Sequence, residues 1–196
     1  PLVYSGWAGV DLFFALSGFL ITSLVLREER EHEARTGRPW FSLRAFYLRR
    51  TLRILPIFYF VLVLNRWVLP YAGVFPSTRL PSTPGDLGTL PFATFWSNYY
   101  LTYGTRLGLR QGPTGNAWAV FWSLAVEEHF YLLWPFFLTF VKRFKTRVAV
   151  GLFVCALCAF ARTLMTAFAA DSPQAVHGLT HYRLDSILWG AIAALV

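Results

Sequence analysis

Two carboxylates and an imidazole, Glu127, Glu128 and His129, interrupt an apolar run between Trp122 and Pro135. A charged side chain at bilayer depth costs roughly 2.5–3.5 kcal/mol on lenient insertion scales, so it normally faces a protein interior or a water-filled cavity. The segment is therefore a candidate functional site, and the alternative is an ion-paired structural group at a helix end. Its spacing alone does not separate catalysis from proton coupling in a transporter.

Helical spacing gives the carboxylate Glu127 two hydroxyl neighbours. Ser123, Glu127 and Tyr131 form one stripe, each a turn from the next, whereas Trp122 and His129 fall on another stripe. A carboxylate with hydroxyl neighbours in surroundings of low dielectric constant can act as an acid–base group. His129 is the other titrating candidate.

The composition of the whole chain indicates a membrane protein. Its 196 residues are 56% apolar and 14% charged, with a mean hydropathy of +0.46, whereas a soluble domain carries about 25% charged residues. Aromatic residues reach 18%, including eight tryptophans, which suits membrane–water boundaries. The net charge of +8 does not indicate nucleic-acid binding, because the basic residues cluster in loops between apolar runs.

Five apolar runs predict membrane spans, so the predicted fold class is all-α, a polytopic transmembrane helical bundle in the lipid bilayer. The spans are predicted at 10–26, 51–69, 117–141, 148–170 and from about Tyr182 onwards. A shorter run at 90–103 contains Pro91 and Asn98 and suits an interfacial or re-entrant segment better than a span. The Pro-, Ser-, Thr- and Gly-rich stretch 71–88 is interpreted as an irregular outer loop.

The distribution of basic residues predicts the topology. Eight arginines lie in Arg27–Arg53 and four basic residues in Lys142–Arg147, but only three lie in 70–115. If 90–103 does not span, the first two loops lie on one side of the membrane. The positive-inside rule then makes both loops cytoplasmic.

Cys155 and Cys158 form a C-x-x-C pair inside an apolar run. No second pair and no thioredoxin-like pattern accompanies them, so buried small apolar residues are a better interpretation than a redox or zinc site. No metal site is predicted.

The first apolar run carries a small, polar helical face made of Asp11, Ala15, Gly18 and Thr22. Small residues let helices approach closely in a membrane, so this face predicts a packing seam. Asp11 lies at its outer end and could stay solvated.

Three arginines, Arg49, Arg50 and Arg53, lie within about one helical turn at the predicted cytoplasmic mouth of the second span. Guanidinium groups at such spacing can bind phosphates bidentately. The alternative is a basic anchor that contacts lipid head groups. Arg53 fits the anchor less well, because the helix has already begun and Pro56 follows.

Four segments, in order, resemble motifs of the membrane acyltransferase family 3. Gly9–Thr22 is similar to the family's second-helix signature, and Arg49–Pro56 to its R-x-x-R loop. Trp122–Tyr131 is similar to its W-S-L-x-V-E-x-x-F-Y segment, and Arg183–Gly190 to its R-L-D helix start. The resemblance covers nearly the whole chain. It implies that residues 1–196 form part of a single integral-membrane acyltransferase domain, truncated at both ends and beginning at the second helix, in the plasma (bacterial inner) membrane.

The resemblance also implies a reaction. The family moves an acyl group, usually acetyl from acetyl-CoA, onto a hydroxyl of an envelope glycan, a lipid-linked saccharide or a small metabolite. Acyl-CoA would be a co-substrate, with no bound cofactor. The family's proposed catalytic histidine lies on the preceding helix, and none of the four histidines here matches it. The family position held by His129 is commonly Gln, which argues against an essential imidazole.

The motif residues then receive expected roles. Arg50 and Arg53 would bind the donor, by holding its phosphates or stabilising charge near the thioester. Glu127 would support catalysis by orienting the upstream histidine or holding a proton. The Asp11–Gly18 face is expected to pack against the preceding helix. The residues expected to pack around the site are Asp11, Ser17, Gly18, Trp122, Ser123, Tyr131, Arg183 and Asp185.

Two other classes of function remain open. A proton-coupled transporter or flippase of a lipid-linked or small-molecule substrate would use Glu127 without covalent transfer, but the internal repeat typical of such proteins is not visible. A sensor module would bind a lipid or peptide and signal through another domain. Release of CoA would distinguish the enzyme from both.

Overall fold

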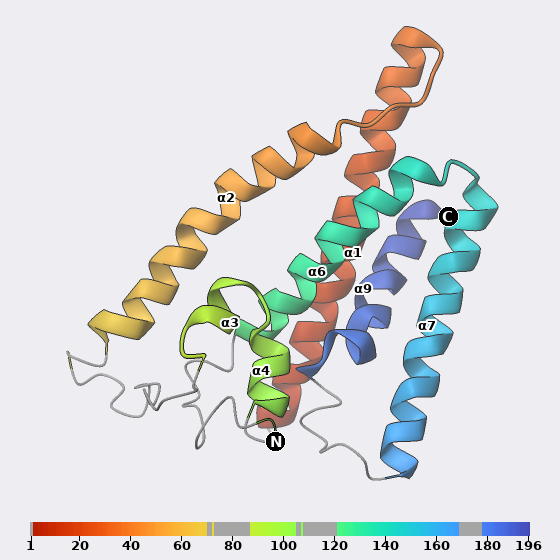
Figure 1. Cartoon of the computed structure of the whole chain (residues 1–196). Helices are drawn as coiled ribbons and strands as arrows, with labels where there is room; N and C mark the ends of the chain where they lie inside the picture. Colours follow the sequence, from red (N-terminus) through yellow and green to blue (C-terminus); the bar gives the residue numbers. More distant parts are fainter. Residues whose placement is uncertain (1, 70–71, 73–86, 105–106, 108–120, 169–177) are drawn as a thin grey trace. The chain divides into compact units, whose positions relative to one another are not determined.

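The computed structural model describes residues 2–69, 72, 87–104, 107, 121–168 and 178–196 (Figure 1). Across these residues the regular secondary structure is helical and contains no strand, which confirms the all-α prediction. Two of the described helices contain stretches that are long and apolar enough to cross a membrane, Ala8–Thr36 and Phe144–Ala167. They correspond to the first and fourth predicted spans.

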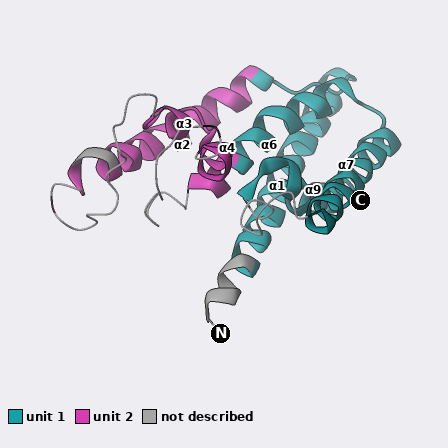
Figure 2. Ribbon diagram, turned by 60° about the horizontal axis from the view of Figure 1, so that its bottom comes forward, with its two compact units in different colours: residues 1–43, 126–196 teal, residues 44–125 magenta. Residues whose placement is uncertain are grey.

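The chain divides into two compact units (Figure 2). Unit 1 comprises Pro1–Leu43 and Val126–Val196, and unit 2 comprises Arg44–Ala125. Helix α6 (Phe121–Phe140) begins in unit 2 and continues in unit 1. That residues 1–196 belong to a single membrane domain stays a prediction, and each unit is described by itself.

Unit 1 is a helical layer in which α9 (Thr180–Leu195) packs against both α1 (Leu2–Thr36) and α7 (Phe144–Ala167) (Figure 1). Helix α1 runs beyond the predicted span 10–26 into a charged end. There Arg27 Nε donates to Glu31 Oε1 over 2.7 Å, one turn away. The helix ends where Gly37, at φ 72°, donates its N–H to Glu33 O over 2.7 Å, a left-handed C-terminal cap that favours glycine.

Glycines set the crossing of α1 and α9. A Cβ atom at Gly18 would lie 2.0 Å from Ile187 O, and one at Gly190 would lie 1.7 Å from Ala15 O. The backbones therefore meet where no side chain fits, as in the small-residue seams of membrane helices. The packing seam is confirmed, and at Gly18 its partner is α9; packing of this face against a preceding helix stays a prediction.

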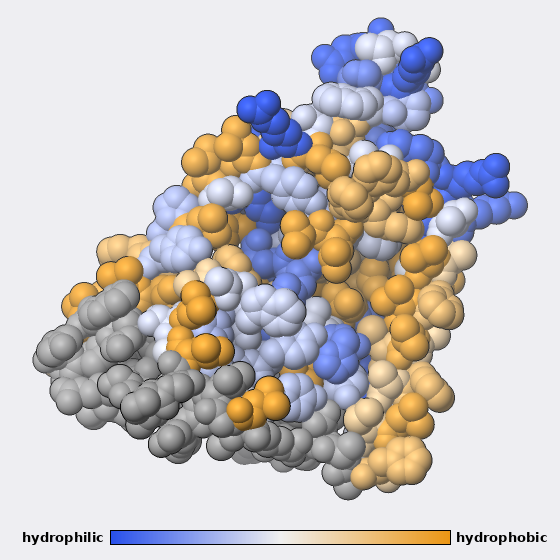
Figure 3. Space-filling model, in the orientation of Figure 1, coloured by the Kyte–Doolittle hydropathy of each residue, from blue (hydrophilic) through white to orange (hydrophobic). Residues whose placement is uncertain are grey.

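The outer face of α7 is apolar, and Figure 3 shows this surface in orange along the helix. Its exposed large side chains are Phe144, Leu152, Phe153, Leu157 and Phe160. Cys155 and Cys158 are buried free thiols, as predicted. A continuous apolar face of this size suits contact with lipid or with another apolar surface.

Unit 2 contains α2 (Leu43–Val63), the π-helical turn Leu64–Val68, and two short helices, α3 (Leu90–Ala93) and α4 (Ser97–Tyr103). Its core is formed by Phe58, Leu62, Phe92, Tyr100 and Phe121. Phe121 also contacts α4, because its backbone carbonyl accepts a hydrogen bond of 3.0 Å from Ser97 Oγ.

The segment 90–103 forms no membrane-spanning helix in this unit. Helices α3 and α4 have four and seven residues, and a span needs about 20. This agrees with the preferred interpretation of the segment, whereas its interfacial or re-entrant placement stays a prediction. Most of the predicted outer loop 71–88, and residues 117–120 of the third predicted span, lie outside the described residues.

Candidate functional site

Glu127 lies on α6 with its side chain buried and its residue 3% exposed. Ser17 Oγ, from α1, donates a hydrogen bond to Glu127 Oε1. Tyr131 OH donates to the same oxygen over 2.9 Å. The helical stripe predicted the Tyr131 contact, whereas the Ser17 contact joins segments 110 residues apart and was not predicted. The arrangement is a buried carboxylate held by hydroxyls from two helices.

A second carboxylate, Asp11, connects α1 to the start of α9. The Arg183 guanidinium donates to Asp11 Oδ1, and Ser186 Oγ donates to the same oxygen over 3.0 Å. The Asp11 side chain is 45% exposed and that of Arg183 is 8% exposed. Asp11 thus keeps solvent contact, as expected for the outer end of the face, but it is also ion-paired.

The neighbouring motif residue Asp185 turns to the other side of α9. Arg162 of α7 donates to both of its carboxylate oxygens, over 2.5 and 3.1 Å, and to Tyr182 O over 2.8 Å. The R-L-D segment therefore fastens α9 in two directions, since Arg183 bonds to α1 and Asp185 to α7. Both residues thus join helices, and their expected place around a catalytic site stays a prediction.

Two further contacts of α6 were not found from the sequence. Trp134 Nε1 donates to Thr22 Oγ1 over 2.8 Å, which joins α6 to the small face of α1. His129 Nδ1 lies 2.8 Å from Thr180 Oγ1, at the start of α9. An imidazole bound to a buried threonine suits a role in packing.

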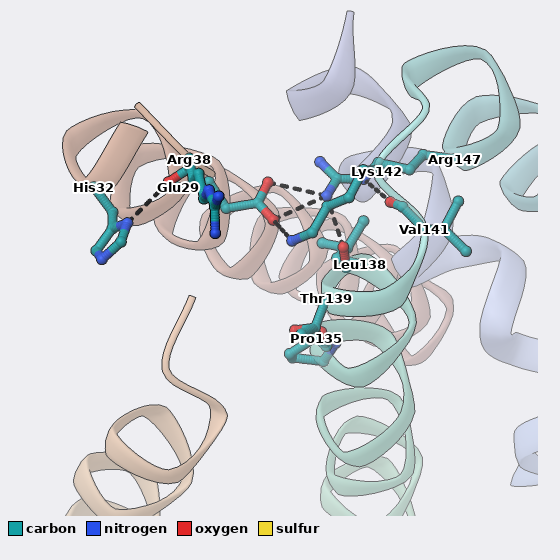
Figure 4. A network of polar contacts seen from close by, with 9 residues as sticks. All are labelled: Glu29, His32, Arg38, Pro135, Leu138, Thr139, Val141, Lys142 and Arg147. Carbon is teal, nitrogen blue, oxygen red and sulfur yellow. Dashed lines mark hydrogen bonds and ion pairs between the residues drawn. The ribbon is translucent and has the colours of Figure 1, made fainter. Parts of the chain in front are cut away.

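Near the charged end of α1, Glu29 forms a buried ion-pair cluster (Figure 4). Arg147 Nη2 lies 2.9 Å from Glu29 Oε2, and Lys142 Nζ lies 2.6 Å from Glu29 Oε1. The same Arg147 donates to Leu138 O and Val141 O, both over 2.6 Å, and so satisfies carbonyl groups at the end of α6.

Glu29 was not predicted, because it lies among charged residues of both signs in Arg27–Arg35. Lys142–Arg147 was predicted only as a basic loop. One signal was present: Glu29 falls seven residues after Thr22 and four after Val25, on the same buried face of α1.

The donor-binding candidates Arg50 and Arg53 lie on α2, which begins at Leu43. Arg50 is half-buried and Arg53 is exposed. Burial raises the pKa of the neighbouring Tyr47 phenol, which keeps this side chain a neutral hydroxyl. The arginines lie on one helix, as predicted, because α2 covers Leu43–Val63.

Arg53 also lines an open groove of about 420 Å³. The other lining residues are apolar: Ile54, Ile57, Phe58, Val61, Phe121 and Leu124. A guanidinium beside an apolar groove can bind the charged group of a ligand whose apolar part lies in the groove. The candidates Trp122 and Ser123 are half-buried in the same unit. In the part of the chain that the structure describes, no group of three or more His, Cys, Asp and Glu residues could hold a metal ion.

Two long apolar helices and a close crossing of helices at glycines are typical of a helical membrane protein. A family model described as an acyltransferase domain matches residues 2–194. The chain belongs to this acyltransferase family, which confirms the resemblance found in its motifs.

Two relatives support the same assignment. The chain is 32% identical over 200 residues to the peptidoglycan O-acetyltransferase OatA of Listeria monocytogenes, covering 97% of the chain and 29% of that protein. It is 30% identical over 199 residues to the O-acetyltransferase OatA of Staphylococcus aureus, covering 97% of the chain and 30% of that protein. The chain therefore spans less than a third of the length of these relatives. No solved structure gives a significant match.

Proposed function

We propose that this chain is part of a membrane-bound O-acyltransferase that moves an acetyl group from acyl-CoA to a hydroxyl of an envelope glycan. Peptidoglycan is the first acceptor to test, because the Listeria relative is named a peptidoglycan O-acetyltransferase. The observation that carries the proposal is the buried Glu127 carboxylate, bound by two hydroxyls, inside a chain matched almost throughout by an acyltransferase family model.

The proposed setting is the bacterial inner membrane, crossed by a polytopic bundle of the five predicted spans. The two apolar helical stretches and the apolar outer face of α7 support this setting. The loops Arg27–Arg53 and Lys142–Arg147 would be cytoplasmic. The contact of Glu29 with Lys142 and Arg147 supports placing the charged end of α1 and the second loop on the same side of the membrane.

The proposed donor site is the groove beside Arg53. Acyl-CoA combines phosphates with a long, less polar pantetheine arm, and the groove offers one exposed guanidinium next to apolar side chains. The phosphates would bind Arg53, with Arg50 one turn away, while the arm would lie along the groove. This position at a cytoplasmic mouth would suit a donor made in the cytoplasm.

Proton-coupled transport is the competing function, because a buried carboxylate such as Glu127 is also what a proton-coupled carrier requires. The two functions differ in covalent chemistry. An acyltransferase releases one CoA thiol for each acyl group transferred, whereas a carrier releases none.

The test uses membrane vesicles that contain the intact protein, acetyl-labelled acetyl-CoA and peptidoglycan fragments. Arg53→Ala should raise the KM for acetyl-CoA by about 10-fold or more, since a hydrogen bond to a charged group contributes about 1.5–3 kcal/mol. Arg44→Ala is the matched control, because Arg44 is exposed on the same helix but does not line the groove. Unchanged kinetics in Arg53→Ala would refute the donor site. Absence of both label transfer and CoA release in the wild type would favour the transporter.

A further inference from the structure

The hydroxyl of Ser17 bonds differently from the hydroxyls of several threonines in the described helices. A serine or threonine inside a helix commonly donates to the carbonyl four residues earlier. Ser17 Oγ instead reaches across to a buried carboxylate on another helix. The threonines with the common pattern in the described residues are Thr22, Thr36, Thr94, Thr102, Thr139, Thr163 and Thr166.

The carboxylate that receives this hydroxyl is fixed from a second side. Tyr131 OH donates to the same Glu127 oxygen over 2.9 Å, and both residues are buried, at 4% and 3% exposure. Ser17 is the member of this set that keeps partial exposure. A reachable hydroxyl, a buried base bonded to it and a third group that orients the base are the parts of an activated nucleophile.

The Ser186–Asp11 pair provides an internal comparison. Ser186 Oγ also donates to a carboxylate on another helix, over 3.0 Å. There the Arg183 guanidinium bonds to the same carboxylate oxygen, so Asp11 already serves in an ion pair that joins α1 to α9. Glu127 Oε1 accepts hydrogen bonds from Ser17 and from Tyr131, the group that orients it. The geometry therefore favours Ser17 over Ser186 as a nucleophile.

We propose that Ser17 carries the acyl group as a covalent O-acyl-serine intermediate, with Glu127 as its general base and Tyr131 as a positioning residue. This inference rests on the proposed function, which supplies the acyl thioester. Ser17 Oγ attacks the carbonyl carbon and its proton passes to Glu127. The carbon–sulfur bond then breaks, and the leaving thiolate takes the proton and departs as the CoA thiol.

The second half of the reaction reverses these proton movements. The acceptor hydroxyl attacks the carbonyl carbon of the serine ester, and its proton passes to Glu127. The bond between Ser17 Oγ and the acyl carbon breaks, and Ser17 recovers its proton from Glu127. No oxidant, reductant or metal enters either step, and each cycle consumes one thioester and one hydroxyl.

The test measures the covalent adduct directly. Vesicles with the intact protein are mixed with acetyl-labelled acetyl-CoA in the absence of acceptor, quenched in acid, and analysed by peptide mapping. The expected result is label on the peptide that contains Ser17, which mapping separates from Ser23 because Phe19 and Leu20 lie between them. Glu127→Gln should slow adduct formation by about 100-fold or more, the usual contribution of a general base.

Matched variants separate chemistry from packing. Ser17→Ala should abolish the adduct and the transfer to acceptor. Ser17→Cys should keep a nucleophile and give a thioester at position 17 that hydroxylamine cleaves at neutral pH. Ser23→Ala, which removes a half-buried hydroxyl from the same helix, should leave adduct and transfer unchanged. Tyr131→Phe should lower kcat with the KM for acetyl-CoA unchanged.

The outcomes that overturn the inference differ from those that overturn the proposed function. Transfer at the wild-type rate by Ser17→Ala, or label on Tyr131 instead of Ser17, would refute the O-acyl-serine while the acyltransferase stood. The same holds if the wild type transfers label to acceptor but forms no adduct at Ser17. Absence of label transfer from the wild type to any acceptor, with no CoA release, would refute both.

Discussion

The crossing of α1 and α9 makes a strong prediction about one glycine. In Gly190→Ala the new Cβ would lie 1.7 Å from Ala15 O, 2.6 Å from Ala15 C and 2.9 Å from Ala15 Cα. All three are backbone atoms, which no rotamer change can move. A normal contact between such atoms is about 3.5 Å. The helices must therefore separate by more than 1 Å to make room for the new methyl group.

The expected cost follows from this overlap. Overpacking a well-packed site costs about 1–3 kcal/mol and occasionally more, and we place Gly190→Ala at about 3 kcal/mol because the opposing atoms cannot yield. For a domain of 150–250 residues, 1 kcal/mol corresponds to about 2–4 °C in Tm, so the expected decrease is about 6–12 °C. The measurement is thermal unfolding of the intact purified protein in detergent.

Gly9→Ala is the matched control for this substitution. It changes the same residue type on α1, at a position where a Cβ would meet nothing within 4 Å. Alanine is favoured over glycine in a helix by about 0.5–1 kcal/mol, so the control should unfold at the wild-type temperature or slightly above it. If Gly190→Ala also unfolded at the wild-type temperature, the close crossing described here would be wrong.

Other contacts of unit 1 give predictions for the same unfolding assay. Arg147→Met leaves Glu29 buried without its main cation and should cost about 3–5 kcal/mol. Lys142→Met should cost less than about 1 kcal/mol, because its side chain is 39% exposed; an equal loss in both variants would contradict the structure. Trp134→Phe removes the indole donor to α1 and should cost about 1 kcal/mol, whereas Trp189→Phe, at a 56% exposed position, should be neutral.

The sequence predicted which segments are helical better than where the helices end. Apolar runs located α1, α7 and α9, but α1 continues to Thr36, ten residues beyond the predicted span. Hydropathy marks the membrane boundary, whereas Arg and Glu favour helix on either side of that boundary. One-turn pairs such as Arg27 and Glu31 stabilise the charged end further.

The site could be predicted only where it depends on local spacing. The contact between Glu127 and Tyr131 follows from one helical turn. The contacts of Ser17 with Glu127, and of Asp11 with Arg183, join residues 110 and 172 apart. Such pairs depend on which helices become neighbours, and neither hydropathy nor helical periodicity carries that information. The family motifs contain these residues but do not indicate how they pair.

Four carboxylates in the described part of unit 1 make contacts between helices, and these contacts separate a role in packing from a role in chemistry. Asp11, Glu29 and Asp185 each share oxygens with a guanidinium. These pairs fix the neighbours of α1 and α9, where apolar packing alone is not directional. Glu127 Oε1 accepts hydrogen bonds from two hydroxyls on different helices. The ion pairs of Asp11, Glu29 and Asp185 therefore hold helices in place, whereas the contact with the partly exposed Ser17 hydroxyl positions Glu127 for proton transfer.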